Sequence, residues 1–206
     1  AFLIGIALVC QMFLAISWRV HLPSWVPWIS GVLVFLVLIQ GVLGALTVTK
    51  LLPSGIVTAH LAIALTLLAS LAGLAQRLFS SPGSSAPLWW RLMGSACLVS
   101  VITQCLLGGR MASSWSAQRC LSQGESCRWL NAHSSSAFFV GLLVLAFVVT
   151  SLIVGGWPRT QWPLLLLVFV LLMIQVSLGI LSVHFVLTKP LLTVGHQLVA
   201  ALLVAS

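Results

Sequence analysis

The stretch that decides the fold is IQGVLGALTVTKLLPSGIVTAHLAIAL, Ile39–Leu65. It predicts the end of one apolar helix, a tight Pro-Ser-Gly turn, and a second apolar helix with His60 near its start. The same pattern returns at Ile174–Ala201, IQVSLGILSVHFVLTKPLLTVGHQLVAA. The first helix repeats 135 residues on, whereas His60 repeats 136 residues on, as His196, so the turn has gained one residue. Two helical hairpins that each deliver a histidine are therefore the repeating unit.

The composition places these helices in a lipid bilayer. The chain has 206 residues, of which 61% are hydrophobic and 5% charged, and no water-soluble fold hides that much apolar surface. A membrane-spanning helix needs about 20 apolar residues, and long apolar runs without polar alternation exclude a membrane β-barrel. Seven stretches meet or approach this length: Ala1–Trp18, Trp28–Thr49, Gly55–Gln76, Leu88–Gly109, Leu130–Val154, Trp162–His184 and Pro190–Ser206.

The net charge of +8 is spread over short loops and is not clustered. This distribution argues against nucleic acid as a partner and favours membrane lipid headgroups or buried anions. The basic residues divide almost equally between the two sides of the expected bundle. The excess of Lys and Arg that marks a cytoplasmic face therefore gives no orientation.

The repeat predicts an all-α polytopic transmembrane helical bundle made of two pseudo-repeated four-helix halves. Residues 1–80 would hold the remainder of the N-terminal half and residues 81–206 the C-terminal half, joined by a Ser-, Pro- and Gly-rich linker at Arg77–Pro87. The counterpart of His133 falls before the first residue, and Leu88–Gly109 has no counterpart at all. We therefore expect an intact protein of eight spans, with the first helix and the start of the second missing here.

The segment Q-x-x-L-G occurs three times, always on an odd-numbered helix of the expected eight. Glycine lets helices approach closely, and glutamine can hydrogen-bond across a helix interface. We interpret these segments as packing sites that reflect duplication and not chemistry. They lie at Gln40–Gly44, Gln104–Gly108 and Gln175–Gly179.

Three histidines, His60, His133 and His196, lie a few residues inside the starts of even-numbered helices. Because these helices run in one direction, the three imidazoles should lie at similar depth near one membrane face. A single buried histidine is more often satisfied by a neighbouring carbonyl, but three at one depth favour metal ligands.

The choice of metal follows from what the spans lack. Zinc and di-iron centres use carboxylates, cysteines or a tight histidine cluster, and no span carries a carboxylate. Two histidines on facing helices beside small residues favour bis-histidine ligation of haem iron. His133 and His196 would bind one haem, and His60 would bind another group with a histidine that precedes the chain.

Cys120 and Cys127 flank a polar loop. A zinc site would need two more ligands that are not evident, whereas a disulfide suits a loop facing an oxidising compartment. We expect the disulfide, which puts this loop on the outer face. Basic residues on that face, Arg128 and Lys189 among them, would then bind haem propionates, with ordinary lipid headgroup contacts as the alternative.

Three segments resemble the haem A synthase family, closest to its cyanobacterial-type branch. GALTVTKLLPSGIVTAHLA is similar to the hairpin of its third and fourth helices, and VGHQLVAALL to the end of its last hairpin. LGGRMASSWSAQRCLSQGESCRWLNAHSS is similar to the segment from its fifth to its sixth helix. The resemblance covers essentially the whole chain, and the order, spacing and topology of the motifs make it fairly specific.

The resemblance implies oxidation of the C8 methyl of haem O to the formyl of haem A, for terminal oxidases. It implies that His133 and His196 ligate a cofactor haem b in the C-terminal half, and that His60 belongs to the substrate haem site. The family places a glutamate on its second helix, which would precede this chain, and Glu125 lies in the wrong loop to replace it. The catalytic residues are therefore expected upstream, and the chain as it stands is expected to be inactive.

The resemblance also implies a multi-pass protein of the bacterial inner membrane, with haem O synthase or terminal-oxidase assembly factors as partners. It leaves the electron acceptor open. Two other functions also remain open. A membrane cytochrome b that only transfers electrons would use the same bis-histidine ligation, and a transporter or structural bundle would have histidines that are not ligands.

Overall fold

The computed structural model describes residues 2–79, 86–124 and 126–206. Within these ranges the chain forms nine helices and no strand. This confirms the predicted all-α fold. The helices are α1 (Phe2–Ser17), α2 (Trp25–Thr49), α3 (Ser54–Phe79), α4 (Leu88–Ser113), α5 (Ser116–Gln123), α6 (Arg128–Val154), α7 (Gly156–Thr160), α8 (Trp162–His184) and α9 (Pro190–Ala205).

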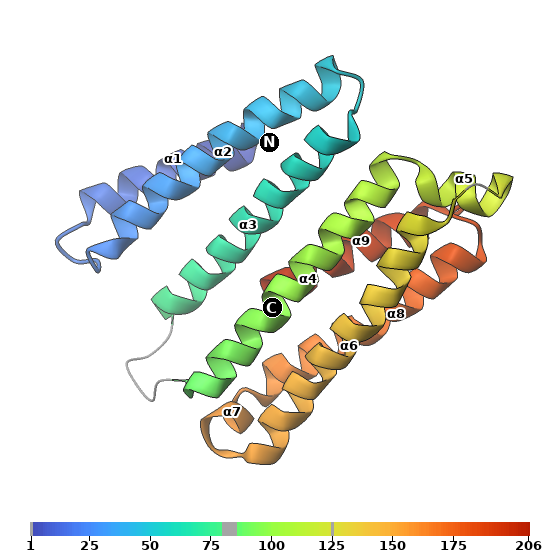
Figure 1. The fold of residues 1–206 in the computed structure, drawn as a ribbon. Coiled ribbons are helices and arrows are strands. Elements are labelled where there is room, and N and C mark those ends of the chain that lie inside the picture. Colours follow the sequence, from blue (N-terminus) through green and yellow to red (C-terminus); the bar gives the residue numbers. More distant parts are fainter. Residues whose placement is uncertain (1, 80–85, 125) are drawn as a thin grey trace. The chain divides into compact units, whose positions relative to one another are not determined.

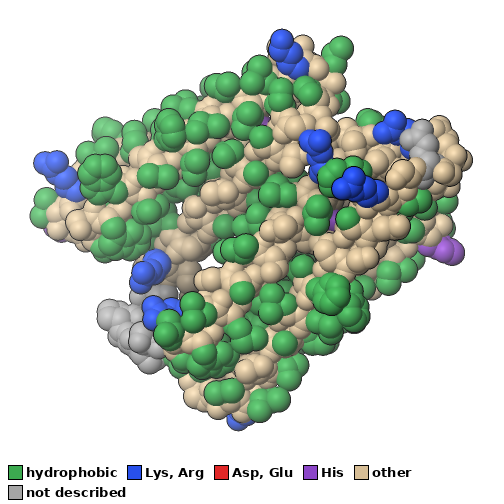
Figure 2. Space-filling model, in the orientation of Figure 1, with side chains coloured by type: hydrophobic (Ala, Val, Ile, Leu, Met, Phe, Trp, Pro, Cys, Tyr) green, Lys and Arg blue, Asp and Glu red, His purple; other side chains and the backbone are tan. Residues whose placement is uncertain are grey.

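Each of the seven stretches predicted from hydropathy forms a helix. Five of these helices, α2, α3, α4, α6 and α8, are long and apolar enough to cross a membrane, whereas α1 and α9 have 16 residues each. Figure 2 shows hydrophobic side chains along the helices and Lys and Arg side chains near helix ends. This distribution is that of a multi-pass membrane protein, whose apolar side chains face lipid.

Two short helices lie where the sequence predicted only loops. α5 interrupts the polar segment before α6, because one side of it buries Ala117 and Cys120 while the other stays polar. Gly124 ends α5 in the left-handed conformation, at φ 70°. α7 occupies the turn between α6 and α8. Glu125 and most of the predicted linker lie outside the described residues.

The chain divides into two compact units, Ala1–Leu71 and Ala72–Ser206. This division falls within α3, and the boundary predicted at residue 80 lies outside the described residues. In the second unit, α6 packs against α4 and α8, and α9 packs against α8 and α4, so these four helices form a closed bundle (Figure 1). In the first unit, α1 packs along α2.

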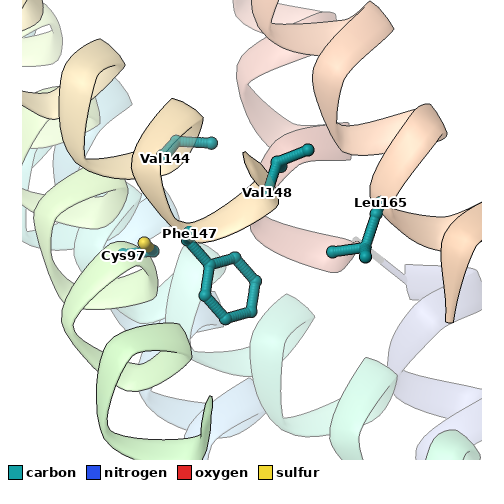
Figure 3. Packing of buried hydrophobic residues seen from close by; sticks show 5 residues of the cluster. All are labelled: Cys97, Val144, Phe147, Val148 and Leu165. Carbon is teal, nitrogen blue, oxygen red and sulfur yellow. The ribbon is translucent and has the colours of Figure 1, made fainter. Parts of the chain in front are cut away.

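The core of the second unit fills one part of this bundle. It joins α4, α6 and α8, and Phe147 lies at its centre (Figure 3). Burial of such side chains stabilises by about 1.5–3 kcal/mol each in water, but in lipid the gain comes mainly from close packing. The buried side chains are Cys97, Val144, Phe147, Val148 and Leu165.

The turns of the α2–α3 and α8–α9 hairpins have the same backbone conformation. Each contains two consecutive non-glycine residues at positive φ, between 51° and 60°. In each, the N–H of the second residue donates to a carbonyl five residues earlier, at 2.8 and 2.9 Å, which is the bond of a Schellman motif. The residue gained by the second hairpin therefore lies between its turn and α9. The positive-φ residues are Leu51, Leu52, Val186 and Leu187.

Candidate functional site

Each of the three candidate histidines lies five or six residues after the start of its helix, on α3, α6 and α9. In all three cases the glutamine of a Q-x-x-L-G segment reaches the ring from the preceding long helix. Hydrogen-bond distances join Gln40 Nε2 to His60 Nε2 (3.1 Å), Gln104 Nε2 to His133 Nδ1 (3.1 Å) and Gln175 Nε2 to His196 Nε2 (3.2 Å).

The glycine of each segment makes room for the imidazole ring. A Cβ built at Gly108, Gly179 or Gly44 would lie 3.0, 3.2 or 3.3 Å from Cε1 of the facing histidine. A relaxed carbon–carbon contact is about 3.5–4.0 Å, so a side chain at any of these positions would push on the ring. By contrast, Gly41 and Gly141 have no described atom within 4 Å of an added Cβ.

We call each set of glutamine, glycine and histidine a histidine cradle. The prediction that these glutamines hydrogen-bond across a helix interface is confirmed, but sequence reasoning missed that a histidine is the partner. The sequence does contain a pattern that indicates this pairing. Each Q-x-x-L-G segment lies on the long helix that precedes one of the three histidine-bearing helices.

Two of the cradles face each other in the second unit. The ring centroids of His133 and His196 are 6.4 Å apart and the rings are inclined by 74°. Two imidazole nitrogens each about 2 Å from one metal ion would place their ring centroids about 6 Å apart. The two rings therefore lie at a separation that suits a single shared metal ion.

The donor set decides which kind of metal centre these two rings fit. Across the described parts of the chain, no group of three or more His, Cys, Asp or Glu side chains could hold a metal ion. A closed zinc site needs four protein ligands. A haem supplies the equatorial ligands of its iron itself, and two histidines complete them. The residues present therefore fit haem better than a bare metal ion.

The ring nitrogens of His196 are oriented by the backbone. Its Nδ1–H donates to the carbonyl oxygen of Gln175 at 3.2 Å, so Nε2 carries the lone pair. This second bond fixes the tautomer in the way common among metal-binding histidines. The Gln175 amide N–H in turn donates to Nε2.

The Gln104 amide is held more firmly than the other two. Its Nε2 also donates to the backbone oxygen of His133, at 2.7 Å, and its Oε1 accepts from the Ser136 hydroxyl, at 2.7 Å. In contrast, Gln40 Oε1 and Gln175 Oε1 are buried and find no hydrogen-bond partner among the described residues. Leaving a buried polar atom unpaired costs about 1–3 kcal/mol, so these two amides are the less stable ones.

His60 has no second histidine opposite it within its own unit as described. The other histidine of that unit, His21, lies between α1 and α2, at the opposite end of α2 from the turn that leads to His60. The Nδ1 of His60 is buried without a hydrogen-bond partner among the described residues. The predicted pairing of His60 with a histidine before the chain lies outside the sequence.

The start of α6 carries the other predicted site residues. Cys120 and Cys127 are joined in a disulfide, with a Cα–Cα distance of 5.1 Å, and Cys127 is the residue that precedes α6. The disulfide thus ties α5 to the helix that carries His133. Arg128 and Lys189 are exposed at the starts of α6 and α9. Their predicted contact with propionates stays a prediction.

Comparison with known proteins places the chain in a family. No curated protein matches it at a significant level. The family model that matches is COX15-CtaA, described as cytochrome oxidase assembly protein, and the match runs over residues 1–206. Because the match covers the full sequence, the chain belongs to the COX15-CtaA family of cytochrome oxidase assembly proteins.

Proposed function

We propose that the protein is a membrane haem A synthase, which oxidises the C8 methyl of haem O to the formyl of haem A for terminal oxidases. Membership of a cytochrome oxidase assembly family supports this, because haem A is a component that such oxidases need. The observation that carries the proposal is the pair of facing imidazoles of His133 and His196, 6.4 Å apart in the bundle of the second unit.

In this proposal His133 and His196 would hold a haem b. A haem b held by two histidines would supply electron transfer. The chain's own residues orient the rings, because Gln104 and Gln175 contact the imidazoles from α4 and α8. His60, in its cradle on α2 and α3, is the ligand proposed for the substrate haem O. The oxidation removes electrons from the methyl group and adds an oxygen atom, so it also needs an electron acceptor and an oxygen source such as water.

The proposed location is the bacterial inner membrane, with the disulfide loop on the outer face. This orientation rests on the preference of disulfides for oxidising compartments. Arg128 and Lys189 lie at helix starts on the same side as the histidines, so both are candidates for binding the haem propionates as charge-assisted donors. Haem O synthase and the terminal-oxidase assembly machinery are the proposed partners.

The second candidate function is that of a membrane cytochrome b that only transfers electrons. It is favoured by the fact that only the second unit, among the parts described, pairs two histidines. Such a protein would bind haem b at His133 and His196 and would leave haem O unchanged.

The test is expression of the full-length protein in cells that make haem O, followed by purification and pigment extraction. We expect bound haem b in the purified protein and haem A in the extract. Haem b without haem A would favour the cytochrome, and a preparation without Soret absorbance would contradict both proposals.

A further inference from the structure

We propose that Arg110, held by Trp129, binds a carboxylate of the haem that His133 and His196 would hold. That carboxylate is a propionate side chain of the macrocycle. Arg110 is then a binding residue, and Trp129 is a positioning residue that acts through it. This inference rests on the proposed haem b site and assigns one further side chain to that site.

The Arg110–Trp129 pair lies next to the histidine cradle of α4 and α6. The guanidinium carbon of Arg110 lies over the indole ring of Trp129, 5.9 Å from its centroid. Trp129 precedes His133 on α6 by about one helical turn, or about 6 Å along the axis. Arg110 follows Gly108, the glycine that faces the His133 ring, near the end of α4. Both helices therefore place the pair just beyond this ring, toward the end of the bundle at which α6 begins.

An arginine at this position is particular to one of the three cradles. The residue two positions after the cradle glycine is Leu46 on α2 and Leu181 on α8. Those two cradles hold their histidines without a charge, so packing of the ring does not require Arg110. The helix dipole does not require it either, because α2 ends with no basic residue in its last turn. The arginine therefore points to a ligand.

Arg110 carries a charge for which the described residues offer no counter-ion. The residue is half-buried, and no acidic side chain lies among the described residues. The indole ring attracts the cation through its π face, so the contact uses none of the five N–H donors of the guanidinium. Arginine binds a carboxylate through two parallel N–H···O bonds. The donors that the ring leaves available match such a group.

The position of Arg110 distinguishes it from the other basic residues at this end of the unit. Arg128 and Lys189 are exposed, whereas Arg110 is half-buried between α4 and the start of α6. A charge-assisted bond is stronger where water is partly excluded. Arg110 is thus suited to the carboxylate nearer the bundle, and the two exposed residues remain candidates for the second one.

The experiment compares hemin with its dimethyl ester, in which both carboxylates are blocked. The full-length protein and its variants are purified haem-free and titrated with each compound, and Soret absorbance gives the two dissociation constants. The wild type should bind hemin more tightly than the ester. In Arg110→Gln the ratio of the two constants should fall about tenfold, because a charge-assisted hydrogen bond to one carboxylate is lost.

Two changes at Trp129 test its positioning role. Trp129→Leu removes the ring and keeps the cation, so the ratio should fall about twofold to fivefold, the size of an exposed cation–π contact. Trp129→Phe keeps an aromatic face and should retain most of the preference for hemin. Arg91→Gln is the matched control, because Arg91 is an exposed arginine in the first turn of the same helix. It should leave the ratio as in the wild type.

The ratio separates carboxylate binding from packing, since a variant that loosens the bundle weakens both compounds alike. An unchanged ratio in Arg110→Gln, the result expected if Arg110 binds a lipid phosphate, would overturn the inference and leave the haem b site standing. A wild type that binds both compounds equally would do the same. If Arg110→Gln does not fold, Arg110→Met, which keeps a long unbranched stem, is measured by the same criterion.

The outcome also separates this inference from the proposed function. A wild type that binds neither compound would remove the proposed haem b site, and the inference with it. Absence of haem A from the pigment extract, with the ratio behaving as expected, would contradict the synthase and leave the role of Arg110 intact.

Discussion

The α2–α3 hairpin and the α8–α9 hairpin share one design but end in different sites. Both have two positive-φ residues in the turn, and both hold a histidine between a glutamine amide and a glycine. Within its own unit as the structure describes it, His196 has a second imidazole facing it, from α6, and His60 has none. Each hairpin therefore supplies one positioned histidine, and a two-histidine site forms where two cradles meet.

The cradles also differ in how firmly the glutamine is held. Gln40 and Gln175 both contact Nε2 of their histidines and both keep an unpartnered amide oxygen. Gln104 contacts Nδ1 and is anchored by Ser136. The two histidines proposed to share haem b, His133 and His196, are therefore supported differently, and His196 shares the less firmly held glutamine with His60.

The largest expected effect comes from removing one histidine from each hairpin. His196→Ala deletes an axial ligand of the proposed haem b, so the purified protein should lose most of its Soret absorbance. His60→Ala should keep haem b and lose the conversion of haem O, because His60 belongs to the first unit and the proposed haem b site to the second. Visible spectra and pigment extraction of the two variants measure the difference.

His21→Ala is the control, since His21 lies in the α1–α2 connection far along the chain from any cradle. It should match the wild type in both measurements. If His60→Ala removed the haem b of the second unit, the assignment of separate roles to the two hairpins would be wrong.

Much of this fold was predictable from the sequence because a membrane-spanning helix is marked by a long apolar stretch. Apolar length alone located seven of the helices, and Trp162–His184 formed with the expected bounds. The short helix α5 was missed because its residues are polar on average, and its burial comes from packing against α4 and α6. Such tertiary contact leaves no signal in hydropathy.

The candidate site was predictable in its histidines but not in its supports. Similar depth along the even-numbered helices of the expected eight singled out His133 and His196. The distance between the two rings depends instead on how the helices that carry them, α6 and α9, cross. The partner of Gln104 depends on which way α4 is rotated, and sequence spacing does not give that angle. The role of Ser136 follows only once that rotation is known.

A medium effect is expected from opening the disulfide, which is present in the second unit alone among the described parts. The double change Cys120→Ser and Cys127→Ser frees α5 from the start of α6. A loop of this length loses about 2–3 kcal/mol of stability in the chain-entropy model. The thermal midpoint in detergent should fall, and hydrogen exchange should speed up in α5 and in the first turns of α6.

Cys10→Ser is the matched control, because Cys10 is a free, exposed cysteine on α1. It should leave both measurements unchanged. Hydrogen exchange that rose equally in α2 and α3 would show that the disulfide acts on the whole chain and not on the unit that contains it.

The smallest expected effect is that of Ser136→Ala, which would make the firm cradle resemble the loose ones. The hydroxyl lies 2.7 Å from both Gln104 Oε1 and the Ala132 carbonyl, so its single proton is shared and its loss should cost only about 1 kcal/mol. Gln104 would then have an unpartnered Oε1, as Gln175 has.

The release of haem b, measured by its transfer to apomyoglobin, should become a few-fold faster in Ser136→Ala. The control is Ser135→Ala, at an exposed neighbouring residue, which should release haem at the wild-type rate. An unchanged rate in Ser136→Ala would mean that the bond from Gln104 to the His133 backbone is a sufficient anchor by itself, and the contrast between firm and loose cradles would then rest on which ring nitrogen each glutamine contacts.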